Sequence, residues 1–449
     1  MIALTLQEIA DLTGGQIHGD AGVEVNGAAA VDSRRVAAGG LFVAIAGEHV
    51  DGHEFVPQAL AAGAAAVLAT RIVDAPCVIV DDVTVALGKI SRELIDRLNA
   101  LTVIGITGSQ GKTSAKDLIA HVLATKESTV ASAGSFNNEL GVPLTVLEAN
   151  ELTRFLVVEM GSRGIGHIAT LCEMAPPEIG VVLNVGTAHI GEFGSAGNIA
   201  IAKGELVEAL PAWGTAVLNA DDVRVAAMAS RTDARVITFG EAGGVRLSDL
   251  TLNDDGEPQF ILSFGPERLA TYVPQIGAHH AINAAAAAAV GVAVGMNLAE
   301  IAHALATAKV SSPMRMAKTV REDGVVIIDD TYNANPDSMA AALRALAAIG
   351  GHGHTYAVLG EMLELGATSA DAHRAVGQLA AELDIDCVVV VGEGAAAIAE
   401  GAGARAHKVA DVDAAVSFLT GRLESSDVVI VKASRGGRLE RVANALLDR

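Results

Sequence analysis

A short segment, Thr107-Gly108-Ser109-Gln110-Gly111-Lys112-Thr113, combines residue types that bind phosphate. Its glycines let backbone N–H groups approach anionic oxygens closely, and Lys112 can contact the outer phosphates of a nucleotide. The Thr113 hydroxyl is a suitable Mg²⁺ ligand. The usual spacing, G-x-x-x-x-G-K-[ST], has glycine where this chain has Ile106, so the loop is a variant of that motif. The segment predicts a phosphate-binding loop, or P-loop, for a nucleoside triphosphate.

The segments around this loop are those that such a loop requires. Residues 102–106 form an apolar, β-branched run that predicts a buried strand. Residues 114–124 favour a helix directly after the loop. A phosphate held between strand and helix would lie at the helix N-terminus, where the helix dipole stabilises negative charge.

Two further side chains follow apolar strands. Glu159 ends the run 155–158, and His189 follows the run 181–188. Because ligands of parallel sheets gather at the carboxyl ends of strands, both are candidate Mg²⁺ ligands beside Thr113. A strand-end ion pair is the alternative role for Glu159, and a structural role is the better one for His189 alone. By composition alone, Lys203 is a surface lysine at the start of a helix.

Several polar residues are weaker candidates for ligand binding. Asn283 could hydrogen-bond a base edge, Arg315 could clamp a phosphate, and Asp330 could bind a ribose. Ser33 and Arg34 pair a hydroxyl with a guanidinium, which suits a phosphate or a uracil edge, although the dipeptide alone is more typical of a solvated turn.

The chain of 449 residues is long enough for two to three domains. From the P-loop onward strand-like runs alternate with helical ones, which indicates parallel sheets with helices on both faces. Residues 245–275 favour an antiparallel hairpin instead. We therefore expect an α/β protein with domains at 1–98, 99–312 and 313–449, the last Rossmann-like but without the G-x-G-x-x-G fingerprint.

Composition excludes several classes of protein. The formal charge of −22 provides no footprint for nucleic acid or an anionic membrane. The three cysteines are far apart in sequence, as expected for reduced thiols. The N-terminal segment lacks the features of a signal peptide, and the longest apolar run, 284–296, is too short to span a bilayer. We expect a soluble, cytoplasmic protein, with a monomer as the default.

Together these segments resemble the Mur ligase superfamily over nearly the whole chain. The motifs that carry the resemblance are Asp32-Ser33-Arg34, Asp51-Gly52-His53-Glu54-Phe55, the variant P-loop, residues 137–144, Glu159-Met160-Gly161, Thr187-Ala188-His189, Ala202-Lys203-Gly204-Glu205, residues 330–338 and residues 359–366. Within the superfamily, the segment Tyr332-Asn333-Ala334-Asn335-Pro336 is most similar to the ligases that add D-alanyl-D-alanine to UDP-N-acetylmuramoyl-tripeptide in peptidoglycan synthesis.

The resemblance implies a reaction and a division of labour between the domains. The tripeptide carboxylate would attack the γ-phosphorus of ATP, and the dipeptide amine would then attack the resulting acyl phosphate. The first domain would bind the UDP moiety through Ser33 and Arg34. ATP would be bound by the P-loop and Asn283, and by Arg315 and Asp330 after domain closure.

The resemblance also implies two Mg²⁺ sites and a substrate surface. Thr113 and Glu159 would hold one ion; Glu159, His189 and Lys203, carbamylated by carbon dioxide, would hold the other. The catalytic residues would be Lys112, Glu159, His189 and Lys203. Residues that would face the substrates are Asn137, Asn138, Ser162, Tyr332 and Asn333. Asp337 is a candidate general base.

Alternatives remain at this point. A sister ligase would add a single amino acid, although neither its N-terminal glycine fingerprint nor an Asp-Asn-Pro-Arg motif is present. A P-loop regulatory GTPase would normally carry Asn-Lys-x-Asp, and this chain has no Asn-Lys dipeptide. The family's usual Lys-Gly-Ser-Arg is Lys432-Ala433-Ser434-Arg435 here, and alanine does not favour a positive φ. The third residue of the tripeptide, lysine or diaminopimelate, stays open.

Overall fold

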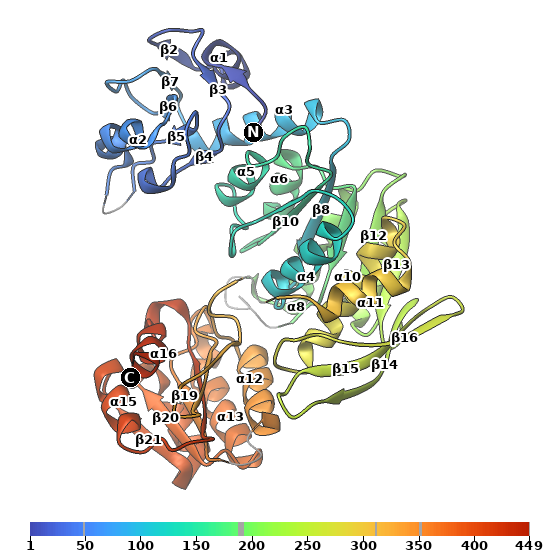
Figure 1. Ribbon diagram of the computed structural model, residues 1–449, viewed down its shortest axis with the longest axis vertical. Helices are drawn as coiled ribbons and strands as arrows, with labels where there is room; N and C mark the ends of the chain where they lie inside the picture. The colour runs from blue at the N-terminus through green and yellow to red at the C-terminus, as the bar shows by residue number, and fades with distance from the viewer. Residues whose placement is uncertain (48–49, 187–192, 310–311, 350–352, 449) are drawn as a thin grey trace.

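The computed structural model describes residues 1–47, 50–186, 193–309, 312–349 and 353–448. Figure 1 shows three bodies in a row, with the N-terminal and C-terminal parts at opposite ends of the central one. The strands of the described residues form one sheet of two strands and three larger sheets of five, nine and six. The larger sheets lie on either side of the expected domain limits, 98/99 and 312/313, which remain predictions. The α/β architecture is confirmed.

The N-terminal part consists of a mostly parallel five-stranded sheet and short helices. Its strand order is β2-β7-β6-β5-β4, in which only β2 runs antiparallel to its neighbour. The elements are β1 (Leu4–Thr5), α1 (Leu6–Thr13), β2 (Gln16–His18), β3 (Glu24–Val25), β4 (Ala29–Ala30), β5 (Leu41–Val43), α2 (Val56–Ala62), β6 (Ala66–Ala69) and β7 (Cys77–Ile79). α1 begins with a capping box in which Thr5 and Glu8 each bind the other's backbone N–H.

Helix α3 (Val83–Arg97) connects the first sheet to the second. The sequence predicts an amphipathic helix over residues 87–100, but the helix begins four residues earlier, because the Asp82 side chain accepts hydrogen bonds from the backbone N–H groups of Thr84 and Val85. Its buried face contacts α1 and two helices of the central domain, α5 (Gly141–Val146) and α6 (His167–Met174).

The central sheet has the order β16-β15-β14-β13-β12-β11-β8-β10-β9. Its parallel strands are β8 (Thr102–Thr107), β9 (Thr129–Ala131), β10 (Phe155–Glu159), β11 (Ile179–Val182), β12 (Thr215–Asn219) and β13 (Arg235–Gly240). The expected antiparallel segment is a meander of β14 (Val245–Leu252), β15 (Pro258–Phe264) and β16 (Glu267–Tyr272).

Helices cover both faces of the central sheet. On one face, α4 (Lys112–Ala124), α10 (His279–Ala293) and α11 (Leu298–Ala306) bury a core that includes Ile104 and Ile106 of β8. On the other, α5, α6 and α8 (Ala196–Glu208) pack around Val103. A short helix, α9 (Val223–Ala226), follows β12. Gly105 faces α8, where a Cβ atom would lie 2.9 Å from Leu206, so the helix packs directly on the strand backbone.

The C-terminal sheet has the order β17-β18-β22-β19-β20-β21 and is parallel except for the edge strand β17. Its strands are β17 (Ala317–Val320), β18 (Val326–Asp329), β19 (Thr355–Leu359), β20 (Cys387–Val391), β21 (Ala406–Val409) and β22 (Val428–Lys432). Helices α12 (Pro336–Ile349), α13 (Ser369–Glu382) and α14 (Ala396–Ala402) cover one face, and α15 (Val412–Thr420) and α16 (Glu440–Leu447) the other. The expected Rossmann-like arrangement is confirmed.

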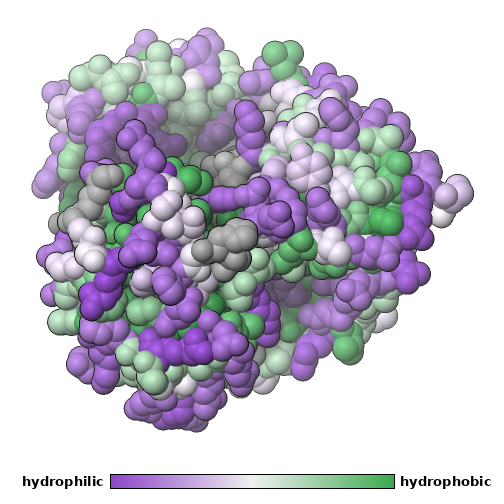
Figure 2. Space-filling model, turned by 60° about the horizontal axis from the view of Figure 1, so that its bottom comes forward, coloured by the Kyte–Doolittle hydropathy of each residue, from purple (hydrophilic) through white to green (hydrophobic). Residues whose placement is uncertain are grey.

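The surface is rich in polar and charged side chains (Figure 2), in keeping with the high net charge of the sequence. Figure 2 shows a face covered mostly by hydrophilic side chains, with hydrophobic ones scattered between them. No helix in the described part of the chain is long and apolar enough to cross a membrane.

Candidate active site

The predicted P-loop lies between β8 and α4, at the carboxyl end of the central sheet. Gly111 precedes α4 with a φ of +78°, a backbone conformation that glycine adopts without strain. A Cβ atom there would lie 3.0 Å from Asn283 Oδ1, so Asn283 packs directly on the loop. Lys112 Nζ donates a hydrogen bond of 2.8 Å to the Gly108 carbonyl, and burial lowers the pKa of Lys112.

The side chains of Asn184 and Ser109 hold the loop against the strand next to it. Asn184 follows β11; its Oδ1 accepts a hydrogen bond from the Gln110 N–H (3.0 Å), and its Nδ2 donates to the Gln110 carbonyl (3.1 Å). Gly186 N–H donates to Ser109 Oγ over 2.9 Å. Sequence reasoning missed Asn184, although its position after an apolar strand was an available signal.

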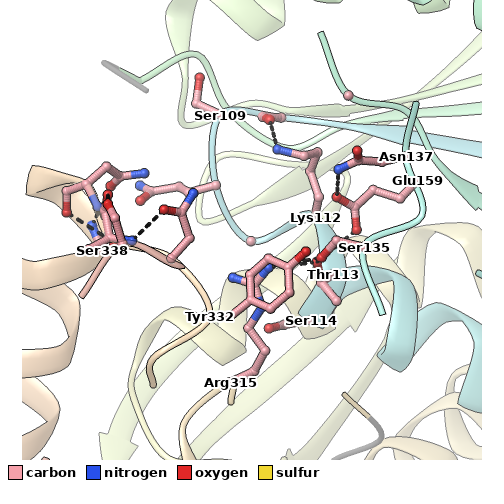
Figure 3. A pocket seen from close by; sticks show the side chains of 18 of the residues that line it. Ser109, Lys112, Thr113, Ser114, Ser135, Asn137, Glu159, Arg315, Tyr332 and Ser338 are labelled. Carbon is pink, nitrogen blue, oxygen red and sulfur yellow. Dashed lines mark hydrogen bonds between the residues drawn. The ribbon is translucent and has the colours of Figure 1, made fainter. Parts of the chain in front are cut away.

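Glu159 is 1% exposed and lies beside Thr113, as predicted. Its Oε2 accepts a hydrogen bond from Thr113 Oγ1 (2.8 Å), and its Oε1 accepts one from Asn137 Nδ2 (2.7 Å). Ser135 Oγ lies 3.0 Å from the Thr113 hydroxyl. Figure 3 shows these side chains together. A buried carboxylate beside a hydroxyl offers the oxygen ligands that Mg²⁺ prefers, so this part of the site fits the ion.

Lys203 is 4% exposed and lines the same cavity, so the reading of it as a surface lysine is wrong. Among the described residues it makes no hydrogen bond or ion pair. Burial, with a smaller contribution from the charge of Lys112, lowers the pKa of Lys203 well below its usual value. An uncharged amine is the form that reacts with carbon dioxide. The predicted ligand His189 lies outside the described residues.

The C-terminal domain contributes Arg315 to this site. Its Nη2 donates hydrogen bonds of 3.2 Å to Thr113 Oγ1 and to Ser135 Oγ. The guanidinium lies 4.0 Å from the centre of the Tyr332 ring. Figure 3 shows the two side chains next to each other. The Tyr332 ring and the hydroxyls of Thr113 and Ser135 therefore hold Arg315 beside the P-loop.

Asp330 is buried and paired with Lys432, a residue to which sequence reasoning assigned no role. Lys432 Nζ lies 2.6 Å from Asp330 Oδ2 and donates to the Asn333 carbonyl over 2.8 Å. Met316 N–H donates to the other carboxylate oxygen of Asp330 over 3.2 Å. This lysine therefore connects β22 to the loop after β18, where Asp330, Tyr332 and Asn333 line the cavity.

The other predicted residues differ in their surroundings. Ser162 lines the cavity with a buried Oγ that has no hydrogen-bond partner among the described residues. Asn138 Oδ1, in contrast, accepts a hydrogen bond from the Gly141 N–H (2.9 Å) at the start of α5. Thr107 Oγ1 is also buried, and no described residue hydrogen-bonds to it. Ser33 and Arg34 lie in the N-terminal domain, outside this cavity. There, Ser33 Oγ donates a hydrogen bond to Gln58 Oε1, and Arg34 forms an ion pair with Asp32.

Ala433 is not among the described residues with a positive φ, so alanine fits the turn after β22 without left-handed backbone strain. Ser434 Oγ accepts a hydrogen bond of 2.9 Å from the Leu363 N–H. The hydroxyl therefore connects the turn after β22 to the loop after β19, and both segments line the cavity.

Two adjacent histidines at the start of α10 were also missed. The ring centres of His279 and His280 lie 4.2 Å apart, and His279 lines the cavity. Burial lowers the pKa of His279 to about 4 and that of His280 well below its usual value. Two uncharged rings therefore adjoin Asn283 at this end of the site.

These segments enclose a cavity of about 640 Å³ between the central and C-terminal domains. Its wall combines P-loop amides, the oxygens of Thr113 and Glu159, the buried Lys203 and an arginine from the other domain. Such a surface can bind a nucleoside triphosphate and stabilise the negative charge that develops during phosphoryl transfer.

Comparison with known proteins agrees with this chemistry. Three domain families match the chain: "Mur ligase family, catalytic domain" over residues 29–121, "Mur ligase middle domain" over 106–291, and "Mur ligase, glutamate ligase domain" over 314–435. The UDP-N-acetylmuramoyl-tripeptide–D-alanyl-D-alanine ligase of Mycobacterium tuberculosis strain H37Rv is 44% identical, over 100% of this chain and 98% of its own length. The Escherichia coli K12 protein of the same name is 34% identical, with 100% and 99% covered.

Solved structures of MurF enzymes share the fold. One from Acinetobacter baumannii superposes with a TM-score of 0.89 at 31% identity, covering 100% of this chain and 99% of its own. MurF from Thermotoga maritima in complex with ADP gives 0.81 at 31% identity, with 94% and 97% covered. The chain therefore belongs to the Mur ligase family of ATP-dependent, ADP-forming ligases, within its group of UDP-N-acetylmuramoyl-tripeptide–D-alanyl-D-alanine ligases.

Proposed function

We propose that this enzyme joins D-alanyl-D-alanine to UDP-N-acetylmuramoyl-tripeptide at the expense of ATP, a step in the synthesis of the peptidoglycan precursor. The observation that carries the proposal is the interdomain cavity in which Lys112, Thr113 and Glu159 face Arg315. Membership of the ligase group supplies the identity of the two substrates.

The residues around the cavity divide the work of the first step. Amides of Thr107, Gly108, Ser109, Gln110 and Gly111 cradle the phosphates of ATP, and Lys112 and Arg315 counter the charge on the γ-phosphoryl group. Asn283 and Asp330 orient the nucleoside. The tripeptide carboxylate attacks the γ-phosphorus, so that ADP leaves and an acyl phosphate forms; catalysis comes from positioning and charge stabilisation.

Thr113 and Glu159 would hold one Mg²⁺, which supplies neutralisation of the phosphate charge when bound. Glu159, His189 and Lys203 would hold a second. The neutral amine of Lys203 adds carbon dioxide and releases a proton, which gives a carbamate whose oxygens resemble a carboxylate. The burial of Lys203 supports this modification, because it disfavours the charged form of the amine.

In the second step the dipeptide amine attacks the acyl phosphate, and phosphate leaves from a tetrahedral intermediate. Asn137, Asn138 and Ser162 face the muramoyl-peptide, whereas Tyr332 and Asn333 face the substrates from the C-terminal domain. Ser33 and Arg34 bind the UDP moiety in domain 1–98. We also propose that the protein is a cytoplasmic monomer.

The test is phosphate release from Mg-ATP with UDP-muramoyl-tripeptide present and D-alanyl-D-alanine included or omitted. Release that requires both substrates, with a pentapeptide product by mass, is the expected result. Lysine-containing and diaminopimelate-containing tripeptides are compared in parallel. Activity with a free amino acid on a shorter peptide would instead assign a sister ligase. No turnover, with tight GTP binding, would assign a regulatory NTPase.

A further inference from the structure

Helix α8, which carries Lys203, is held to α6 by Glu205. Glu205 is buried, with 8% of the residue exposed. Its Oε1 accepts a hydrogen bond from the Gly166 N–H (2.6 Å) and its Oε2 accepts one from the Ala169 N–H (3.0 Å). α6 begins at His167 and has no side-chain cap of its own, so a carboxylate from another helix satisfies its first turn.

This contact joins the two segments that carry Glu159 and Lys203. Residues 160–166 lead directly from Glu159, at the end of β10, to the first turn of α6. Glu205 lies two residues after Lys203 on α8. The buried side chain of Glu205 therefore fixes helix α8, which carries Lys203, against the segment that directly follows Glu159.

Arg231 holds α8 from another side. Its Nη1 and Nη2 each donate a hydrogen bond of 3.0 Å, to the carbonyls of Ala200 and Ile201 respectively. Its Nε donates to Glu208 Oε1 over 2.9 Å. Both carbonyls lie in the turn of α8 that precedes Lys203.

Gly204, the residue after Lys203, makes room for this guanidinium. A Cβ atom at position 204 would lie 1.7 Å from Arg231 Nη1, well inside any tolerable contact. The absence of a side chain at Gly204 is thus a condition for the contacts of Arg231. Gly204 and Glu205 directly follow Lys203. Gly204 leaves the space that Arg231 occupies, and Glu205 binds the first turn of α6.

We propose that Glu205 and Arg231 are positioning residues for Lys203, fixing α8 so that its amine meets the oxygens of Glu159 and Thr113 in the cavity. The inference rests on the proposed function, in which Lys203 is modified and binds metal. A lysine side chain is long and flexible, so its usable position depends on a fixed backbone. Neither positioning residue needs to contact the reacting atoms, because their polar groups are bound to backbone and to Glu208.

Three variants test the proposal: Glu205→Gln, Arg231→Ala and Gly204→Ala. Gln keeps the shape of Glu205 but turns a donor towards a backbone N–H, and Ala at position 204 displaces the guanidinium. The matched control is Glu208→Gln, which changes the exposed partner of Arg231 and leaves its carbonyl contacts. Each protein is assayed for kcat and KM, and the carbamate carbon is observed by ¹³C NMR in ¹³C-bicarbonate.

We expect kcat of the three variants to fall by about 10–100-fold, with the KM for ATP changed less than about threefold. The carbamate signal at a fixed bicarbonate concentration should fall with kcat, and excess bicarbonate should restore part of both. The control should resemble the wild type in every measurement.

Wild-type kcat and carbamate signal in well-folded Glu205→Gln and Arg231→Ala would overturn the proposal. So would a loss of kcat that follows only the fraction of unfolded protein in thermal melts. If Glu205→Gln does not fold, Arg231→Ala and Gly204→Ala decide. A wild type that bears a carbamate but does not join the two substrates would refute the proposed function instead, and the signals of the variants would still test the positioning.

Discussion

Arg315 of the C-terminal domain donates a hydrogen bond to Thr113 of the P-loop, over 3.2 Å and across 202 residues of sequence. The same Thr113 hydroxyl donates to Glu159, so one side chain joins the nucleotide loop, the candidate metal ligand and the second domain. Residues of two domains therefore build this part of the cavity, and Arg315 is the side chain that reaches the P-loop from the second.

Replacing Arg315 by alanine should lower kcat by about 10–100-fold, because hydrogen bonds to a charged group contribute about 1.5–3 kcal/mol. Arg315→Lys should recover little of this loss, since an ammonium cannot stack flat on the Tyr332 ring as the planar guanidinium does. Steady-state phosphate release measures both variants. Full activity of the lysine variant would show that only the charge matters.

Removing the Thr113 hydroxyl should affect the metal rather than the fold. Thr113→Val keeps the shape of the side chain but removes an oxygen ligand beside Glu159, so we expect kcat to fall by about 100-fold or more. Thr113→Ser retains the oxygen and is the control. Titration of activity with Mg²⁺ should show a raised requirement in the valine variant. Equal Mg²⁺ curves for valine and serine would contradict the assignment.

Local sequence was sufficient for the parts of the site that lie on one strand–loop–helix unit. Apolar β-branched runs predicted β8 and β10, and glycines with Lys112 and Thr113 predicted the loop between β8 and α4. Parallel pairing of β8 with β10 then placed Glu159 beside Thr113, as expected. The burial of Lys203 was not readable from composition, because it depends on how α8 packs against the sheet.

Contacts between distant segments were beyond local reasoning. Lys432 and Asp330 are 102 residues apart, and Asn184 and Gln110 are 74 apart, so no spacing rule relates them. The edge strands β17 and β21 were also missed, because their residues are mostly half-buried or exposed and carry no continuous apolar run. Sequence reasoning thus predicted the sheets better than their edges.

Asn184 should determine how well the P-loop is formed. Asn184→Ala removes both of its hydrogen bonds to Gln110 and leaves two backbone groups without those partners, which costs about 1–2 kcal/mol. We therefore expect the KM for ATP to rise by about 5–30-fold with a smaller change in kcat. Asn184→Asp keeps the acceptor for the Gln110 N–H and should lie between alanine and the wild type. An unchanged KM in the alanine variant would mean that the loop is formed without this clamp.

His279 should make the stability of the enzyme depend on pH. Burial lowers its pKa to about 4, while Asp330 opposes and Lys432 adds to the shift; in the unfolded chain the pKa returns to about 6.5. Between these values the unfolded chain binds the proton and the folded chain does not. The stability that comes from keeping His279 uncharged is therefore complete above pH 6.5. It is lost as the pH falls towards 4, by about 3 kcal/mol in all.

Urea unfolding at pH 7.5 and pH 5.0 measures this loss of stability, and His279→Asn should lose less stability over this interval. His280 is present in both proteins, and burial, the larger cause of its lowered pKa, is shared by them; only the smaller contribution of His279 is lost in the variant. His303→Asn, at an exposed position on α11, is the control that should behave as the wild type. Parallel losses in the wild type and His279→Asn would mean that His279 does not titrate in this window.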